Sequence, residues 1–444
     1  MVGTNGAKYL VAVIGAGPAG IYAAKHLVDS GAYVVLFNRD IKPGGLAEYG
    51  IYPNKHKMKE GLRKKFHSII ADQRIVYCGN ASIGAEADLS IADIQKFGFQ
   101  AILVTVGAQG TKWLSLPGEE YKGVYHAKDL VYHYNALPPF SENNYPVGQR
   151  AALIGVGNVM MDIAHWMVRE LKIKKVIAVA RRGPAEVKFA KKEMKNIANN
   201  LDISAFESEL ARVAERMVAV GQDVEQARSF ILSGLDQAHE QISSTCFSFQ
   251  FLSSPSAIIG DEDGTVIGLE VEDTELVLRN GDTKAQGLGT RRILDVDTVV
   301  FCIGDRVDDT LGLPTQWNEF TKNPKPIYPV KGISYEAFDP EADKPVEGVF
   351  LAGWAREASS GLVGTARKDG TSGASALLTY LAKAEPIAEI DLSEMYATLE
   401  KLDKRVISKE DWYRIEEAEH SEAKKRDLPS FKFTTNEEML ALFD

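Results

Sequence analysis

The chain has 444 residues, a formal net charge of −10 and 45% hydrophobic residues, a composition that fits about two or three globular domains. The negative charge argues against bulk binding of nucleic acid, and no apolar run reaches the roughly 20 residues of a membrane span. The N-terminus does not have the pattern of a secretory signal. The three cysteines, Cys78, Cys246 and Cys302, are far apart, so we expect no metal cluster or dithiol pair, and a cytoplasmic location.

A glycine-rich turn near the N-terminus lies between a predicted strand, 9–14, and a predicted helix, 21–30. Its pattern is Gly15-x-Gly17-x-x-Gly20, the spacing of a dinucleotide-binding fingerprint. In that motif the first glycine permits the tight turn, the second lets a pyrophosphate approach the backbone, and the third lets helix and strand pack closely. The sequence therefore predicts a nucleotide site at this turn.

The residues after the first helix complete a βαβ unit, with a second strand at 33–37 and a further strand at 101–106 that ends at Gly107. Such a unit predicts a parallel sheet and the α/β class. Asn38 stands where an acidic residue usually binds the ribose. It can still donate and accept hydrogen bonds but carries no charge.

The pattern of strand, glycine turn and helix begins again at residue 150. A predicted strand, 150–154, precedes Gly155-Val156-Gly157, and a predicted helix, 158–171, carries Met160 at the third glycine position. After the next strand come Arg181 and Arg182. Paired arginines there can bind a ribose 2′-phosphate, which distinguishes NADP from NAD, although a basic strand end is the plainer alternative.

Farther along, 185–245 is largely helical in pattern and 246–303 reads as strands and turns. A strand at 348–352 then leads into Gly353-Trp354, and a helix follows from about Gly361. An aromatic residue flanked by glycine, with backbone amides at a helix start, can border the ring system of a flavin. A position in the core is the alternative for Trp354.

Taken in order, these motifs resemble the adrenodoxin reductase family, which includes bacterial ferredoxin–NADP reductases and is related to the small-subunit-like flavoproteins of glutamate synthase. The resemblance spans nearly the whole chain and includes Gly44-Gly45-Leu46, Tyr49-Gly50-Ile51, Leu116-Pro-Gly118-Glu119, Arg181-Arg182-Gly183-Pro184, and Asp411-Trp412. It implies two Rossmann-like dinucleotide-binding domains: a discontinuous FAD domain, 1–109 and 335–444, with an inserted NADP(H) domain, 110–334.

The resemblance also implies which residues contact each cofactor. For FAD they are Gly15, Gly17, Ala19, Gly20, Asn38, Gly45, Leu46, Ala81, Gly107, Gly353, Trp354, Gly361, Leu362 and Val363. For NADP(H) they are Gly155, Val156, Gly157, Asn158, Val159, Arg181, Arg182, Glu193 and again Gly361.

The chain departs from the family after Pro53, where the family often has Asp-His and this sequence has Asn54-Lys55-His56. The family's histidine lies near the aspartate that matches Asp162. We therefore predict that Lys55 contacts Asp162 and takes part in catalysis, with His56 as the alternative to Lys55.

The combination predicts an FAD-dependent oxidoreductase that passes hydride between NADPH and flavin, and single electrons between flavin and an iron–sulfur or flavodoxin carrier. Three alternatives remain: a reductase subunit of a larger electron-transfer complex, a flavin enzyme acting on a small organic substrate, and a nucleotide-sensing protein without catalysis. The sequence leaves the acceptor, the direction, the redox potential and the oligomeric state open.

The segment Lys55–Lys65 holds six basic residues and one acid, Glu60. Most charged residues lie on protein surfaces, so a solvated helix face is the simpler interpretation. The functional interpretation is a docking surface for an acidic ferredoxin-like protein or flavodoxin.

Overall fold

The computed structural model describes residues 8–443, which divide into two compact units. The first unit contains the described residues up to Thr111, together with Tyr132–Glu142 and the chain from Gly304 onward. The second contains Lys112–Val131 and Asn143–Ile303. The chain thus leaves the first unit twice, after Thr111 and after Glu142, and returns to it each time.

The first unit is built on a six-stranded sheet in the order β17-β18-β4-β1-β2-β3. All neighbours in this sheet are parallel except β17, which is antiparallel to β18. The carboxyl ends of the five parallel strands therefore meet at one edge. The strands are β1 (Tyr9–Ile14), β2 (Ala32–Phe37), β3 (Ile75–Cys78), β4 (Ala101–Val104), β17 (Glu336–Asp339) and β18 (Lys344–Leu351).

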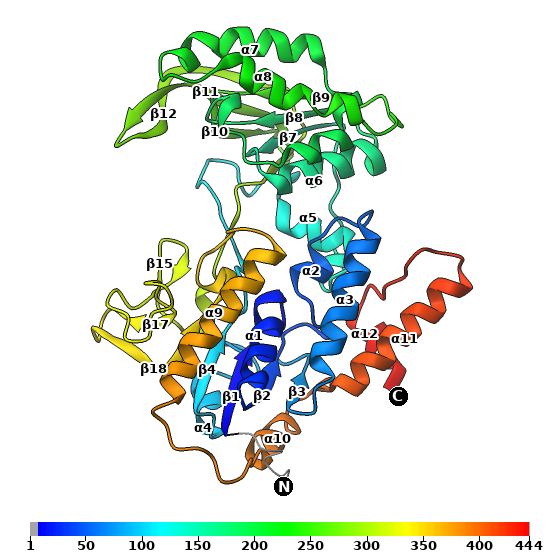
Figure 1. Ribbon diagram of the computed structural model, residues 1–444. Helices are drawn as coiled ribbons and strands as arrows, with labels where there is room; N and C mark the ends of the chain where they lie inside the picture. The colour runs from blue at the N-terminus through cyan, green and yellow to red at the C-terminus, as the bar shows by residue number, and fades with distance from the viewer. Residues whose placement is uncertain (1–7, 444) are drawn as a thin grey trace. The chain divides into compact units, whose positions relative to one another are not determined.

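Successive residues of a strand point to opposite faces of the sheet. Both faces of this sheet are apolar, and helices cover both of them. Val11 and Val13 belong to one hydrophobic cluster, and Leu10 and Ala12 to the other. On the first face, α1 and α9 lie side by side (Figure 1). The helices of the unit are α1 (Pro18–Asp29), α2 (Leu46–Tyr49), α3 (His56–Ile70), α4 (Ile91–Lys96), α9 (Val363–Leu381), α10 (Ser393–Leu399), α11 (Lys409–Lys425) and α12 (Asn436–Leu440).

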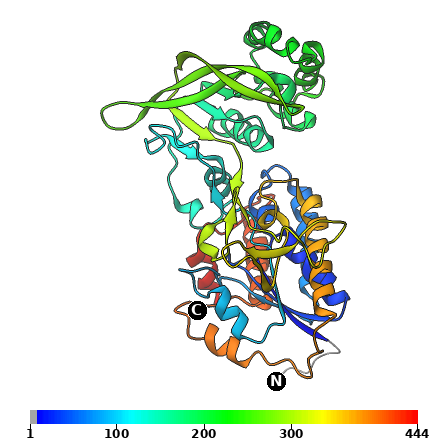
Figure 2. The same ribbon diagram turned by 90° about the vertical axis from the view of Figure 1, so that its left-hand side faces the viewer.

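The second unit has a five-stranded parallel sheet in the order β6-β13-β7-β8-β9. Its strands are β6 (Val124–His126), β7 (Arg150–Ile154), β8 (Lys175–Val179), β9 (Cys246–Gln250) and β13 (Thr298–Phe301). Its helices are α6 (Asn158–Trp166), which ends in a π-helical turn, α7 (Ile203–Val218) and α8 (Val224–Leu232). An antiparallel sheet adds β10 (Ser253–Gly260), β11 (Val266–Arg279) and β12 (Asp282–Leu294), the last two forming a long hairpin (Figure 2).

The second unit is shorter than the predicted inserted domain, 110–334, because 132–142 and 304–334 pack with the first unit. After β13 the chain forms β14 (Asp305–Arg306), which pairs with β5 (Gly110–Thr111). Leu311, Leu313 and Phe320 then enter the first unit's core. The small hairpin of β15 (Thr315–Gln316) and β16 (Glu319–Phe320) belongs to this segment.

The predicted strands and the helices of both βαβ units are present, with end points that differ by a few residues. The segment 110–150, predicted to be rich in loops, also contains the helix α5 (Ala127–Tyr134). Among residues 8–443, no helix has the length and apolar character needed to cross a membrane.

Candidate functional site

The first glycine turn joins β1 to α1, and two of its glycines are required by packing. Gly15 has φ of 105°, and a Cβ built on it would lie 2.7 Å from the backbone carbon of Thr105. A Cβ on Gly20 would lie 2.0 Å from the carbonyl oxygen of Gly15. The backbone after β4 therefore leaves no room for a side chain at Gly15, and the close approach of α1 to the turn leaves none at Gly20.

Gly17 is different, because nothing in the protein requires a glycine there. Its backbone, with φ of −78° and ψ of −177°, is open to any residue, and a Cβ on it would have no neighbour within 4 Å. Gly17 also starts α1, where no side chain caps the helix and no acidic residue lies in the first turn. The start of α1 thus combines backbone N–H groups that no side chain caps with open space beside Gly17, which is what a pyrophosphate group requires.

A second glycine pair lies against this turn. The Gly44 N–H donates to the carbonyl of Ala16 at 2.7 Å, and Gly45, with φ of 49°, starts α2. A Cβ on Gly45 would lie 3.1 Å from the Cα of Gly17. The residues around Gly17 are therefore bordered by backbone rather than by side chains, a surface that suits close approach of a ligand.

Asn38 is buried at the end of β2, and its side chain is bonded within the protein. Its Oδ1 accepts from the N–H of Ala16 at 3.0 Å, and its Nδ2 donates to the carbonyls of Asp40 and Lys42 at 2.8 and 3.1 Å. These bonds hold the glycine turn and the loop after β2 together. The predicted contact of Asn38 with a cofactor stays a prediction, and the role visible here is to fix the turn.

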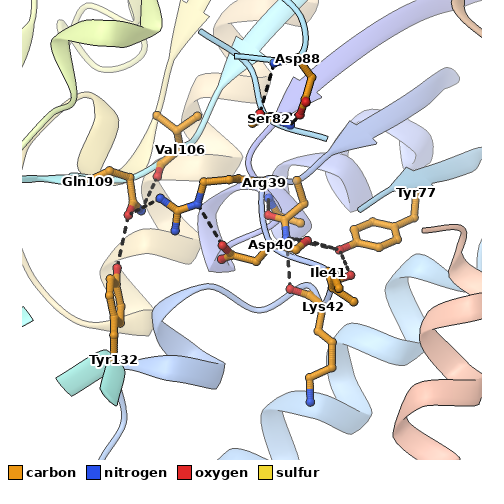
Figure 3. Close-up of polar contacts among 12 residues, drawn as sticks. Arg39, Asp40, Ile41, Lys42, Tyr77, Ser82, Asp88, Val106, Gln109 and Tyr132 are labelled. Atoms are coloured by element: carbon orange, nitrogen blue, oxygen red, sulfur yellow. Dashed lines mark hydrogen bonds and ion pairs between the residues drawn. The ribbon is translucent and has the colours of Figure 1, made fainter. Parts of the chain in front are cut away.

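The residues after Asn38 form a chain of polar contacts that the sequence reasoning missed (Figure 3). Arg39 donates to Asp40 at 3.0 Å and, at 3.4 Å, to the side-chain oxygen of Gln109. The hydroxyl of Tyr132 also donates to that oxygen at 3.4 Å. Gln109 in turn donates to the carbonyl of Val106. This chain links the end of β2 to the segment after β4, and the only sequence signal for it was the place of Arg39 directly after Asn38.

The turn after β18 packs against the start of α1. A Cβ on Gly353 would lie 2.6 Å from the Cβ of Ala19, and a Cβ on Gly370 would lie 2.2 Å from the carbonyl oxygen of Ala19. The indole N–H of Trp354 donates to the carbonyl of Ser360 at 2.8 Å, and Leu362 is 67% exposed at the start of α9. The distant segment that begins at Gly353 thus adjoins the first glycine turn.

The residues predicted to contact FAD come together in the first unit. They follow or adjoin the carboxyl ends of parallel strands, so they lie along one edge of the sheet. After β1 come Gly15, Gly17, Ala19 and Gly20; after β2, Asn38, Gly45 and Leu46; after β3, Ala81; after β4, Gly107; and after β18, Gly353, Trp354, Gly361, Leu362 and Val363.

Behind α2 lies a cluster of buried charges, which we call the Glu48 cluster: Lys42, Glu48, Lys59, Arg63, Glu419 and Lys432. Glu48 is 4% exposed, accepts two hydrogen bonds from Arg63, and lies 2.6 Å from the amine of Lys432. Burial alone would raise the pKa of Glu48, but the charges of Lys432 and Arg63 hold it well below its ordinary value. The cluster connects the segment that carries Gly45 to the C-terminal tail, through the pairs Lys42–Glu419 and Glu48–Lys432.

Lys59 is the member of the Glu48 cluster without a carboxylate contact in the hydrogen bonds described. Its amine donates to the side-chain oxygen of Asn135 at 2.8 Å and to the carbonyl of Ile51 at 3.2 Å. Burial, followed by the charge of Lys432, lowers the pKa of Lys59 to about 6. At neutral pH this side chain is therefore mostly a neutral amine.

These contacts remove two of the six basic residues from both interpretations of the segment Lys55–Lys65. Lys59 is buried and donates to Asn135, and the partly buried Arg63 pairs with Glu48, so neither side chain is free for a solvated face or a docking surface. The exposed cations of α3 are Lys57, Lys64 and Lys65, and Lys64 pairs with Glu60. The alternation of inward and outward residues on α3 produces this split.

The second glycine turn joins β7 to α6 and repeats the plan of the first. Gly155 has φ of 116°, and a Cβ on it would lie 2.5 Å from the carbonyl oxygen of Cys302. A Cβ on Gly157 would have no neighbour within 4 Å, and no side chain caps α6. Met160, at the third position, is fully buried. This turn also presents uncapped N–H groups to open space.

The predicted NADP residues gather around this turn. Arg181 and Arg182 follow β8, and Arg181 is exposed while Arg182 lies 3.4 Å from Glu186. The segment that follows folds back over the turn: Ala190 donates its N–H to the side chain of Asn158 at 2.8 Å, and Lys188 donates to the carbonyl of Val156. Glu193 lies at the end of this segment and is buried. Gly361 belongs to the first unit.

The predicted catalytic residues lie in different units. Lys55 precedes α3 in the first unit, and Asp162 lies in α6 of the second. Their contact stays a prediction.

Residues 9–205 match the family model of the pyridine nucleotide-disulphide oxidoreductases. NADPH-ferredoxin reductase FprA of Mycobacterium leprae is 26% identical over 97% of this chain and 98% of its own length. The mitochondrial NADPH:adrenodoxin oxidoreductase of Bos taurus is 25% identical over 97% of this chain and 91% of its own. The chain is thus similar over nearly its whole length to ferredoxin and adrenodoxin reductases.

The fold agrees with this relationship. A structure of FprA from Mycobacterium tuberculosis in complex with NADPH aligns with a TM-score of 0.81 at 25% identity, over 98% of this chain and 99% of that one. The likeness therefore includes both units and the C-terminal tail, and the mixed α/β architecture with two parallel sheets is shared.

Proposed function

We propose that the protein is an FAD-dependent oxidoreductase that transfers electrons between NADPH and a ferredoxin-like iron–sulfur protein or a flavodoxin. The observation that carries the proposal is the pair of uncapped glycine turns, one in each unit, with open space at Gly17 and Gly157. The full-length likeness to ferredoxin and adrenodoxin reductases supports the same function.

The two turns fit different cofactors. The edge that carries Gly17, Gly45 and Gly353 is long and assembled from both ends of the chain, which suits the extended FAD molecule. The second turn has Arg181 and Arg182 beyond the next strand, which suits the 2′-phosphate of NADP(H). When bound, FAD would exchange hydride with the nicotinamide and single electrons with the carrier protein.

The chain's own residues would bind and orient the two cofactors and exclude water from between them. The helix starts of α1 and α6 would hold the negatively charged diphosphates of the two cofactors, and the Glu48 cluster holds the loop that carries Gly45. Lys55 and Asp162 are proposed to assist at the nicotinamide end. The variant Lys55→Ala should slow reduction of the flavin by NADPH, and an unchanged rate would remove Lys55 from the mechanism.

The decisive test compares carriers. The purified protein, loaded with FAD, should oxidise NADPH and pass electrons to ferredoxin or flavodoxin. The reduction of cytochrome c by the reduced carrier measures this transfer. Equal activity with quinones or other small acceptors in the absence of a carrier would favour the enzyme acting on an organic substrate. Activity only in the presence of a stable partner chain would favour a reductase subunit of a larger electron-transfer complex. A purified protein without bound flavin would favour a nucleotide-sensing protein without catalysis.

An acidic carrier, a cytoplasmic location and the docking face are finer parts of the proposal. The three cysteines are free thiols, as a reducing compartment favours. Lys57 and Lys65 are exposed cations of α3, and we propose that they attract the carrier. Reversal of both to glutamate should lower carrier-dependent turnover severalfold, most at low ionic strength, where charges are least screened.

A matched control uses Lys344→Glu with Lys401→Glu, which makes the same charge change at exposed positions at the start of β18 and after α10. An equal loss in both double variants would show that net charge alone matters, and no loss in either would exclude α3 as the docking face. Reversal of Arg63 is unsuitable for this test, because it would place two carboxylates together in the Glu48 cluster.

A further inference from the structure

A buried ion pair lies directly behind the turn that follows β18. Asp369 in α9 and Arg356 after the turn have side chains that are 13% and 11% exposed. Arg356 donates to Asp369 through Nη2 at 2.6 Å and through Nε at 3.1 Å. The hydroxyl of Tyr335 also donates to Asp369, at 3.2 Å, and the guanidinium lies 4.9 Å from the centre of the Tyr335 ring. Burial alone would lower the pKa of Arg356, but Asp369 raises it.

The same carboxylate holds the backbone of the turn. Asp369 accepts a hydrogen bond of 2.6 Å from the N–H of Gly353, whose φ is 68°. Gly353 lies against Ala19 at the start of α1, and Trp354 is the next residue. Asp369 therefore fixes the peptide group that borders the first glycine turn, and Arg356 fixes Asp369.

Stability alone is a weak reason for this arrangement. Removing two charges from water costs several kcal/mol, and well-packed apolar residues often replace a buried pair without loss. The pair instead delivers a charge-assisted hydrogen bond to one backbone N–H at the proposed flavin site. It also places the Arg356 cation and two carboxylates beside that site: Asp369, which is largely buried, and Glu357, which lies 3.1 Å from Arg356 and is 53% exposed.

We propose that Asp369 is a positioning residue for the flavin, which holds the Gly353–Trp354 turn in place, and that the balance of Asp369 and Arg356 sets the flavin's midpoint potential. The proposal rests on FAD binding, as in the proposed function. Reduction adds negative charge to a flavin, so an unbalanced cation nearby raises the potential and an unbalanced anion lowers it.

The test measures FAD release and the flavin midpoint potential in the FAD-loaded protein. Asp369→Asn removes the better buried of the two negative charges that pair with Arg356 and should raise the potential, whereas Arg356→Met removes the positive charge and should lower it. Both variants loosen the turn, so each should release FAD about tenfold faster. Arg356→Lys keeps the positive charge, so its midpoint potential should lie closer to the wild-type value than that of Arg356→Met. Tyr335→Phe removes one bond from Asp369 and provides a milder variant that is expected to fold.

The control is Glu336→Gln. Glu336 is more deeply buried than Asp369 and lies in the same unit. It accepts backbone N–H bonds from Ile327 and Tyr328 at 2.6 and 3.0 Å, on a loop that carries no predicted flavin residue. It should change stability but neither the potential nor FAD release. Shifts of the same sign in Asp369→Asn and Arg356→Met, or no shift in either, would overturn the proposal. A wild-type protein that binds no FAD would instead overturn the proposed function itself.

Discussion

The two glycine turns are alike at two positions and differ at the third. In both, the first glycine has positive φ and lies against the backbone that follows a neighbouring strand of the sheet, Thr105 after β4 and Cys302 after β13. The second glycine has free space where a Cβ would be. The third position holds Gly20 in the first turn, where even a methyl group would meet the carbonyl of Gly15, and a buried Met160 in the second. The residue at the third position therefore indicates how closely the helix packs against the turn, whereas the glycine at the second position indicates room for a ligand.

The difference at the third position predicts the largest effect. Gly20→Ala should lower the free energy of unfolding by about 3 kcal/mol, because its Cβ would lie 2.0 Å from backbone that cannot move away easily. Met160→Leu, which keeps the volume, should cost less than about 1.5 kcal/mol. Chemical denaturation measures both, and similar losses would mean that the two turns are packed alike.

The shared second position predicts a loss of ligand without a loss of stability. Gly17→Ala should weaken FAD binding at least about tenfold, and Gly157→Ala should raise the KM for NADPH about as much, since each Cβ would occupy the space proposed for a diphosphate. Neither should lower the unfolding temperature of the apoprotein. Weakened FAD binding in Gly157→Ala, with Gly17→Ala unaffected, would reverse the assignment of the two turns.

The nucleotide specificity of the second turn provides a finer test. Arg181→Gln combined with Arg182→Gln should lower kcat/KM for NADPH about tenfold or more and leave the value for NADH nearly unchanged, because only NADPH carries the 2′-phosphate. Stopped-flow reduction of the flavin measures both rates. Lys192→Gln, an exposed basic residue nearby in sequence, is the control. Equal losses for both nucleotides would argue against a 2′-phosphate contact.

The first turn also differs from the second in resting on the Glu48 cluster, and this difference predicts a pH effect. An unfolded chain protonates Lys59 below about pH 10.4, whereas the folded chain does so only below about 6. The unfolded state therefore binds the extra proton between these values, and stability should rise with pH across that window. Lys59→Met should flatten this part of the pH profile of unfolding. Lys57→Met, at an exposed position, should leave the profile unchanged. Equal slopes of unfolding free energy against pH in the wild type and both variants would show that the pKa of Lys59 is not lowered by folding.

Much of the fold could be predicted because its signals are local. Apolar runs and the glycines at 15 and 155 identify strands and turns from residues adjacent in the chain, whereas the nucleotide type read from the arginines after β8 stays a prediction. The domain boundaries were less predictable. Whether 304–334 packs with one unit or the other depends on Phe320 and on the β14–β5 pairing, which no local pattern reveals.

By itself, the sequence determined that two nucleotide turns exist and where each begins, because the backbone geometry of a turn depends on a few neighbouring residues. Only the tertiary structure decided what the remaining side chains do. Asn38 is occupied by the turn itself, Lys59 and Arg63 point inward, and Asp369 reaches the N–H of Gly353 from another helix. Each of these roles depends on burial and on partners far away in the chain, and packing alone brings those partners together.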